Sequence, residues 1–203
     1  ADWGTAVHRA LEAAARGAEG DALRTVCRAA LVDAERPADE HGEPAELDEL
    51  HALVDAVRAS AVWTRAAAAE HRLAEVPFAL HLTAAQAHEL GISADGRAGE
   101  SAPEAGSGSG DASEAGALKD AAGTNECDVL VEGVVDLAFR EAGAWTLVDY
   151  KTGAGDLAEP GDARMVGYRR QVDLYAACWQ RITGEPVAGR VVVLADAGRE
   201  VAW

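Results

Sequence analysis

The stretch Trp145–Lys151, WTLVDYK, has the composition of a buried β-strand that ends in charged residues. Side chains alternate between the two faces of a strand, so the odd-numbered residues of this stretch are predicted to share one face. The Asp149 carboxylate then lies beside the Lys151 ammonium, with their Cα atoms roughly 6–7 Å apart along the strand. These charges form either a solvent-facing ion pair or part of a functional site, because burying them without partners is costly.

A second predicted strand, Val129–Phe139 (VLVEGVVDLAF), lies just upstream. We predict that one of its faces carries Val129, Val131, Val135, Leu137 and Phe139. The other face is predicted to carry Glu132, Val134 and Asp136. Residues 141–143, Glu-Ala-Gly, form the predicted hairpin turn between the two strands. Folding the hairpin about this turn brings Asp136 opposite Asp149, within about one residue of register.

Two carboxylates and one lysine therefore converge at one edge of the predicted sheet. Adjacent carboxylates repel each other unless a cation lies between them. Sites rich in carboxylate oxygens suit Mg²⁺ or Mn²⁺. A neighbouring ammonium group can orient a water molecule or stabilise developing negative charge. This combination predicts metal-dependent cleavage of a phosphodiester, with the metal generating the nucleophile.

The segments GVVD (133–136) and LVDYK (147–151) resemble the core motif of the PD-(D/E)XK nucleases. The resemblance is closer to the RecB-like subgroup, which adds two features. One is GxxxH on an N-terminal helix, found here as Gly4–His8 (GTAVH). The other is QxxxY on the helix after the lysine, found here as Gln171–Tyr175 (QVDLY). All four segments occur in the order of the family.

This resemblance implies an α/β fold of the restriction-endonuclease-like type, a mixed central sheet flanked by helices. It also implies a metal site for one or two Mg²⁺ or Mn²⁺ ions, held by His8, Asp136, Asp149 and the backbone carbonyl of Tyr150. Lys151 would position the attacking water or stabilise the transition state, a term that is often large in catalysis. Gln171 and Tyr175 would face the active site and contact the nucleic acid or the surroundings of the lysine.

Four further residues are candidates for binding, each with an alternative interpretation. Arg164, Arg169 and Arg170 form a basic group on the predicted helix 162–183 and could receive DNA phosphates. The alternative for them is a solvated helix face. Glu75 precedes the sequence VPF, as an acidic residue does in many RecB-like domains. It would lie near the metal or order a basic neighbour, or else be an ordinary solvated glutamate.

The remaining pattern predicts one nuclease domain over residues 1–203, helical to about residue 70 and built around the sheet from about residue 71. The predicted helices span 2–16, 21–35, 46–70 with a break near Ser60, 83–90 and 162–183. The other predicted strands span 71–82, 187–195 and 199–203. The stretch 93–125 is rich in Gly, Ala, Ser and Glu, and is predicted to be a disordered, low-complexity insertion.

The composition limits the possible functions. A chain of 203 residues can bury the core of one domain. Its net charge of −17 disfavours tight DNA binding by the chain alone, because phosphates attract Lys and Arg. The lysines are Lys119 and Lys151, and all other basic residues are arginine or histidine. Lysine at position 151 therefore suggests a role for a compact ammonium group.

The three cysteines are far apart in the sequence and predict no disulfide framework. They are too few for the four-cysteine iron–sulfur cluster that some relatives of the resembled family carry. No apolar run has the length of a membrane span, and no signal peptide is recognisable. We therefore expect a cytoplasmic protein that does not bind membranes.

We expect an Mg²⁺- or Mn²⁺-dependent deoxyribonuclease that acts exonucleolytically on single-stranded DNA. A helicase domain of the same polypeptide or of a partner subunit would deliver the strand, as in AddA-, RecB- and Adn-type helicase–nucleases that repair double-strand breaks by recombination. The start of the chain inside a motif-bearing helix suggests part of a longer polypeptide. The alternatives are a non-catalytic DNA- or partner-binding module of the same fold, and a stand-alone RecB-like nuclease in repair or defence.

Overall fold

The computed structural model describes residues 3–92, 129–153 and 162–203. These residues form a five-stranded sheet with the order β1-β2-β3-β4-β5. Its strands are β1 (His71–Leu82), β2 (Val129–Glu141), β3 (Ala144–Lys151), β4 (Val187–Leu194) and β5 (Arg199–Ala202). Strands β3 and β4 run parallel, and all other neighbouring strands are antiparallel. The mixed central sheet confirms the predicted α/β class.

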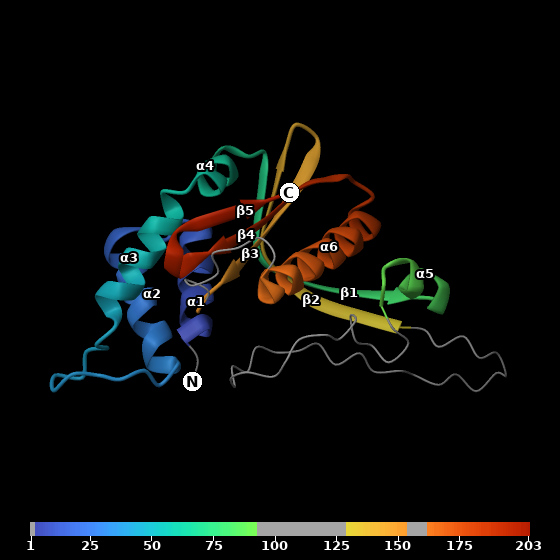
Figure 1. Ribbon diagram of the computed structural model, residues 1–203. Helices are drawn as coiled ribbons and strands as arrows, with labels where there is room; N and C mark the ends of the chain where they lie inside the picture. The colour runs from blue at the N-terminus through green and yellow to red at the C-terminus, as the bar shows by residue number, and fades with distance from the viewer. Residues whose placement is uncertain (1–2, 93–128, 154–161) are drawn as a thin grey trace.

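Four helices pack together on one side of this sheet (Figure 1). They are α1 (Trp3–Ala15), α2 (Gly20–Asp33), α3 (Leu47–Arg58) and α4 (Ala61–Ala68). Their apolar stripes bury against sheet residues that include Phe139 and Val148, and we call this the α1–α4 core. The predicted break near Ser60 is confirmed, because the Ser60 hydroxyl caps α4 by accepting a hydrogen bond from the Trp63 N–H.

Helix α6 (Ala163–Thr183) packs on the opposite side of the sheet (Figure 1). It begins after Asp162, whose carboxylate accepts from the Arg164 N–H, and ends at Gly184 with a φ of 71°. Its buried residues, such as Val172 and Trp179, share one hydrophobic cluster with Leu147 of β3, and we call this the α6 core. The short helix α5 (Ala84–Glu89) lies at the far end of the β1–β2 pair, and a single 3-10 turn, η1 (Ala195–Ala197), follows β4.

A two-residue turn joins β2 to β3 and sets the register of the hairpin. Ala142 and Gly143 occupy it with φ values of 50° and 80°. Two consecutive positive φ values match the turn type whose twist suits a tight hairpin. The paired residues run from Glu141↔Ala144 to Leu137↔Val148. One step further along this register, Asp136 meets Asp149, as the sequence predicts.

At one point of the β1–β2 pair, residues two positions apart in a strand point to opposite sides of the sheet instead of the same side. Leu137 of β2 and Ala74 of β1 belong to the α1–α4 core, whereas Val135 and Val76 belong to the α6 core. The prediction that Val135 shares a face with Leu137 and Phe139 is therefore wrong. In β1 this exchange of faces occurs at Glu75, which lies between Ala74 and Val76 and has a φ of 50°.

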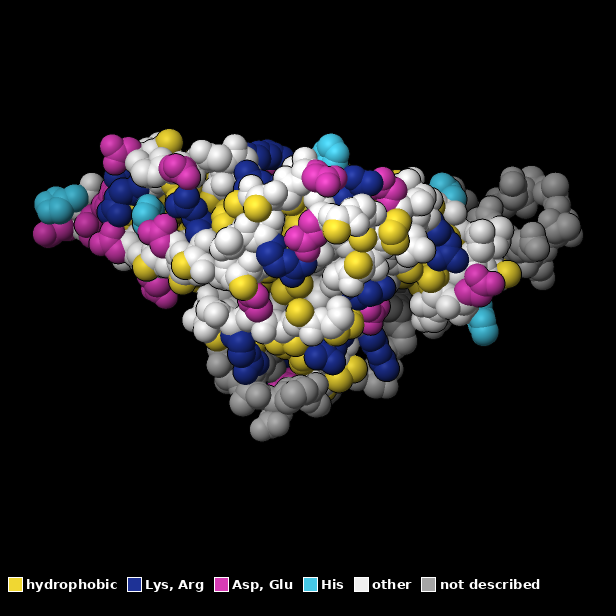
Figure 2. All heavy atoms as spheres, turned by 90° about the horizontal axis from the view of Figure 1, so that it is seen from above, with side chains coloured by type: hydrophobic (Ala, Val, Ile, Leu, Met, Phe, Trp, Pro, Cys, Tyr) yellow, Lys and Arg dark blue, Asp and Glu magenta, His cyan; other side chains and the backbone are white. Residues whose placement is uncertain are grey.

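Two other sequence predictions concern an insertion at residues 93–125 and the lack of a membrane-spanning segment. The predicted insertion 93–125 lies outside the described residues. None of the helices in the described ranges is both long enough and apolar enough to cross a bilayer. Figure 2 shows one face of the molecule, on which Lys and Arg side chains are dispersed among Asp and Glu side chains rather than gathered into a continuous basic surface.

Candidate active site

Helix α1 carries His8 to the carboxyl end of β3, 142 residues away in the sequence. The His8 Nε2 atom lies 3.1 Å from the backbone carbonyl oxygen of Tyr150, and its Nδ1 atom lies 3.3 Å from Asp136 Oδ1. The other oxygen of Asp136, Oδ2, accepts a hydrogen bond of 2.7 Å from the Tyr150 N–H. The structure thus brings together three of the four groups that the resemblance assigns to a metal.

The fourth group, Asp149, is 7% exposed and lies beside Lys151 on the same face of β3. The Lys151 Nζ atom is 3.0 Å from each Asp149 carboxylate oxygen. Lys151 also donates a hydrogen bond of 2.9 Å to Gln171 Oε1, and Gln171 Nε2 donates one of 3.2 Å to the Tyr175 hydroxyl. The predicted lysine, glutamine and tyrosine therefore form one connected chain between β3 and α6.

Tight packing around Gly133 supports the far end of this chain. The Tyr175 ring meets the Phe78 ring edge-on, with centroids 5.1 Å apart. A Cβ atom added at Gly133 would lie 2.9 Å from both rings, closer than real Cβ atoms come. The glycine of the GVVD segment is therefore needed for the close approach of these rings to β2.

Tyr168 is a residue of the site that the sequence analysis does not include among its candidates. Its ring packs against the α6 core, and the ring centroid lies 5.2 Å from the Lys151 Nζ atom. An ammonium group facing an aromatic ring at this distance is attracted by the ring's negative face. The spacing contained a signal, because Tyr168 is three residues before Gln171 and seven before Tyr175, which places all three on one side of the helix.

The charges of the site depend strongly on one another. Burial, followed by repulsion from Asp136, raises the pKa of Asp149 to about 7. Burial alone would lower the pKa of His8, but its interactions with Asp136 and Glu75 raise it to about 10. Burial would likewise lower the pKa of Lys151, but the Asp149 carboxylate outweighs this effect and raises it. Each shift reflects carboxylates crowded together in a buried place.

These residues fit a divalent cation. Ligand atoms of His8, Glu75 and Asp136 lie within 4.8 Å of one another. Asp149 Oδ2 is buried and accepts no well-directed hydrogen bond, although the Lys151 ammonium is close to it. Carboxylate and carbonyl oxygens with one imidazole are a suitable donor set for Mg²⁺ or Mn²⁺. The Glu75 Oε1 atom lies 3.7 Å from His8 Nδ1, so this carboxylate stands next to the proposed metal ligands.

The three arginines of α6 do not share one environment. The Arg169 guanidinium stacks on the Trp203 ring, 5.1 Å from its centroid, on the side of the helix opposite Gln171. Arg164 is half-exposed and lies 3.6 Å from Asp162. It stands on the same side of the helix as Tyr168, four residues later. Arg170 is exposed. A role for these three residues in binding DNA stays a prediction.

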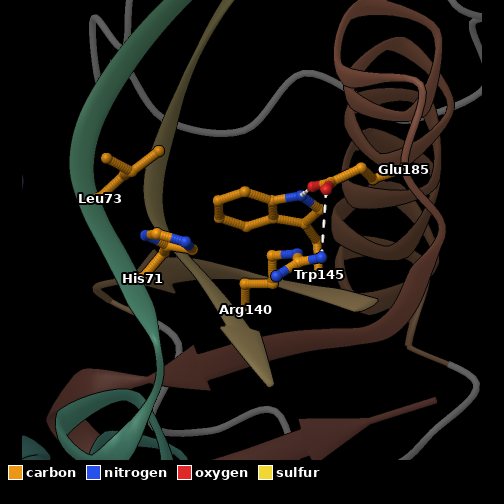
Figure 3. Close-up of a pocket in the computed structure, with 5 residues that line it drawn as sticks. All are labelled: His71, Leu73, Arg140, Trp145 and Glu185. Atoms are coloured by element: carbon orange, nitrogen blue, oxygen red, sulfur yellow. Dashed lines mark hydrogen bonds and ion pairs between the residues drawn. The ribbon is translucent and has the colours of Figure 1, made fainter. Parts of the chain in front are cut away.

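A pocket of about 320 Å³ lies at the other end of the sheet, next to the β2–β3 turn (Figure 3). It is lined by His71, Leu73, Arg140, Trp145 and Glu185. Within the pocket, Glu185 accepts a hydrogen bond of 2.5 Å from Trp145 Nε1 and lies 3.2 Å from Arg140 Nη2. The pocket lacks the buried carboxylates of the β3 end, so we assign the chemistry to that end.

Comparison with known proteins agrees with this geometry. The chain matches the family model of the PD-(D/E)XK nuclease superfamily over residues 1–201. It therefore belongs to this superfamily, and its mixed sheet with flanking helices is of the restriction-endonuclease-like type.

Two curated relatives show which kind of nuclease polypeptide this chain resembles. The chain is 42% identical over 74 residues to an ATP-dependent helicase/nuclease subunit of Desulforamulus reducens. It is 36% identical over 73 residues to the protein of the same name from Pelotomaculum thermopropionicum. Each match covers 36% of this chain and 6% of the relative. The chain therefore resembles a small part of a much longer helicase–nuclease polypeptide.

Proposed function

We propose that this chain is a single-domain, Mg²⁺- or Mn²⁺-dependent deoxyribonuclease. The observation that carries the proposal is the position of Lys151, held between Asp149 and Gln171 next to the His8–Asp136–Tyr150 group. A structural ion pair needs neither the second buried carboxylate nor the histidine. A phosphodiester-cleaving site uses all of them.

Each residue has a definite task in this mechanism. The side chains of His8, Asp136 and Asp149 and the Tyr150 carbonyl would hold the cation. When bound, the cation lowers the pKa of a water molecule and offsets negative charge on the phosphate. The raised pKa of Lys151 keeps its ammonium protonated at neutral pH. Lys151 would therefore orient the water or stabilise the charge of the transition state as an ammonium group.

We further propose exonucleolytic action on single-stranded DNA that a helicase domain delivers, in recombinational repair of double-strand breaks. The names of the two relatives support the link to a helicase. The net charge of −17 supports it independently, because such a chain gains little from electrostatic attraction to DNA and benefits from delivery of the strand. The exposed Arg164 and Arg170 would contact the phosphates.

The proposal is tested by incubating the chain with linear single-stranded DNA at low salt and with Mn²⁺ or Mg²⁺. The variants Lys151→Ala and Asp149→Ala should lose cleavage, and EDTA should abolish cleavage by the wild type. Lys119→Ala removes the other lysine of the chain and is the matched control, which should cleave normally. Full activity of either site variant would overturn the proposal. Metal binding without any cleavage would instead favour a non-catalytic module.

A further inference from the structure

His8 presents its two ring nitrogens to different partners. Nε2 faces the Tyr150 carbonyl oxygen at 3.1 Å, and this carbonyl is one of the proposed metal ligands. Among the described residues, the carboxylates that face Nδ1 belong to Asp136, at 3.3 Å, and Glu75, at 3.7 Å. A neutral imidazole carries one proton, so when Nε2 offers its lone pair to a cation, Nδ1 holds the proton and needs an acceptor.

Asp136 is poorly suited to be that acceptor once a cation is present. Its Oδ2 atom already accepts from the Tyr150 N–H, and its Oδ1 atom, which faces His8 Nδ1 at 3.3 Å, would be drawn toward a cation bound by the same carboxylate. Glu75 is the other carboxylate at Nδ1, and its side chain is one-quarter exposed, which leaves it room to turn. At 3.7 Å its Oε1 atom lies just beyond hydrogen-bond length, and a small rotation closes the gap.

The backbone of β1 aims Glu75 at this point. Glu75 has a φ of 50°, which a non-glycine residue in a strand rarely adopts. It lies between the pairs Ala74↔Leu137 and Val76↔Val135, directly across from Asp136. This turn of β1 brings the Glu75 carboxylate to the imidazole ring of His8, which belongs to helix α1.

We propose that Glu75 is a positioning residue. Its carboxylate accepts the hydrogen bond of His8 Nδ1–H and holds Nε2 toward the cation, and in this way it increases the affinity of the site for Mn²⁺ or Mg²⁺. Metal-binding histidines generally donate their second N–H to such a carboxylate or carbonyl, which holds the ring in one orientation. The inference rests on the proposed function, whose metal site it deepens.

Binding of Mn²⁺ alone, measured by calorimetry on the purified chain, tests this role without any activity assay. Glu75→Gly tolerates the positive φ and removes the acceptor, so it should weaken Mn²⁺ binding about 10- to 100-fold. Glu75→Gln keeps an oxygen acceptor of the same reach and should lose less. Glu40→Ala removes a carboxylate whose side chain is 88% exposed, and should bind like the wild type.

A double-mutant cycle with His8→Ala separates positioning from direct ligation. If Glu75 acts through His8, Glu75→Gly should cause no further loss of Mn²⁺ affinity in the His8→Ala background. An equal loss in both backgrounds, or no loss in the wild type, would overturn the proposal. Because the readout is binding, a chain that shows this coupling but cleaves no DNA would leave the inference intact and refute only the nuclease function.

Discussion

Gln171 accepts a hydrogen bond of 2.9 Å from the Lys151 ammonium and thereby ties helix α6 to the carboxyl end of β3. The other end of its amide donates to Tyr175, whose ring packs against Phe78. The lysine is therefore held by an element that follows it in the sequence, and its position depends on how α6 packs on the sheet.

Replacing Gln171 with Ala removes a hydrogen-bond acceptor of Lys151 and should slow cleavage about 100-fold. Displacement of a catalytic group by roughly 1 Å lowers the rate by about that factor. The loss should be in kcat in a steady-state assay on single-stranded DNA, with the fold and the affinity for Mn²⁺ retained. Tyr175→Phe keeps the ring and removes only the hydroxyl that Gln171 contacts, so its effect should be smaller. A larger effect of Tyr175→Phe than of Gln171→Ala would contradict this order.

Gly133→Ala should destabilise the chain by about 1–3 kcal/mol, because overpacking forces neighbouring groups to shift. The new Cβ atom would meet the Phe78 and Tyr175 rings at 2.9 Å, so cleavage should slow as well. Urea unfolding and the cleavage rate measure the two effects. Gly167→Ala, in the interior of α6, is the matched control.

The Gly167 control should change stability in the opposite direction. A Cβ atom at Gly167 meets nothing within 4 Å. Alanine favours a helix by about 0.8–1 kcal/mol over glycine, so this variant should be more stable than the wild type. A Gly133→Ala variant as stable as the Gly167→Ala variant would show that the rings have room to move.

The metal-free chain should lose stability as the pH rises from about 6.5 to about 10. Burial opposes the charge of His8, but Asp136 and Glu75 outweigh it and raise the pKa of His8 from 6.5 to about 10 in the folded state. The folded state therefore binds the proton more tightly than the unfolded state. This stabilisation is complete below pH 6.5 and disappears as the pH rises through the folded pKa.

Thermal unfolding in EDTA across this pH range measures the effect. His8→Ala should flatten the dependence on pH in this window, whereas His41→Ala, at an exposed position, should leave it unchanged. Equal slopes for the wild type and His8→Ala would refute the link between His8 and the two carboxylates.

Much of this architecture follows from local patterns. The alternation in WTLVDYK places Asp149 and Lys151 on one face, and the turn at residues 142–143 sets the register that brings Asp136 to Asp149. Both are short-range effects, because strand periodicity and hairpin twist depend on neighbouring residues. The order of the four motif segments is equally visible in the sequence.

Other features depend on contacts between distant segments. The exchange of faces at Glu75 could not be predicted, because strand periodicity assumes a regular backbone and a positive φ in a glutamate gives no sign in the composition. The contacts of Tyr168 and Arg169 could not be predicted either. A helical repeat shows which residues share a side of the helix, but not which other residues that side contacts. One faces Lys151, and the other stacks on Trp203.

The sequence alone therefore determined the class of the fold and the hairpin that carries the two aspartates, and it predicted candidate residues that meet at the carboxyl end of β3. Only the tertiary structure decided how these residues meet. The distance of 3.1 Å between His8 and the Tyr150 carbonyl joins residues 142 positions apart. It results from the packing of α1 against the sheet, which is the sum of many non-local apolar contacts and has no local pattern of its own.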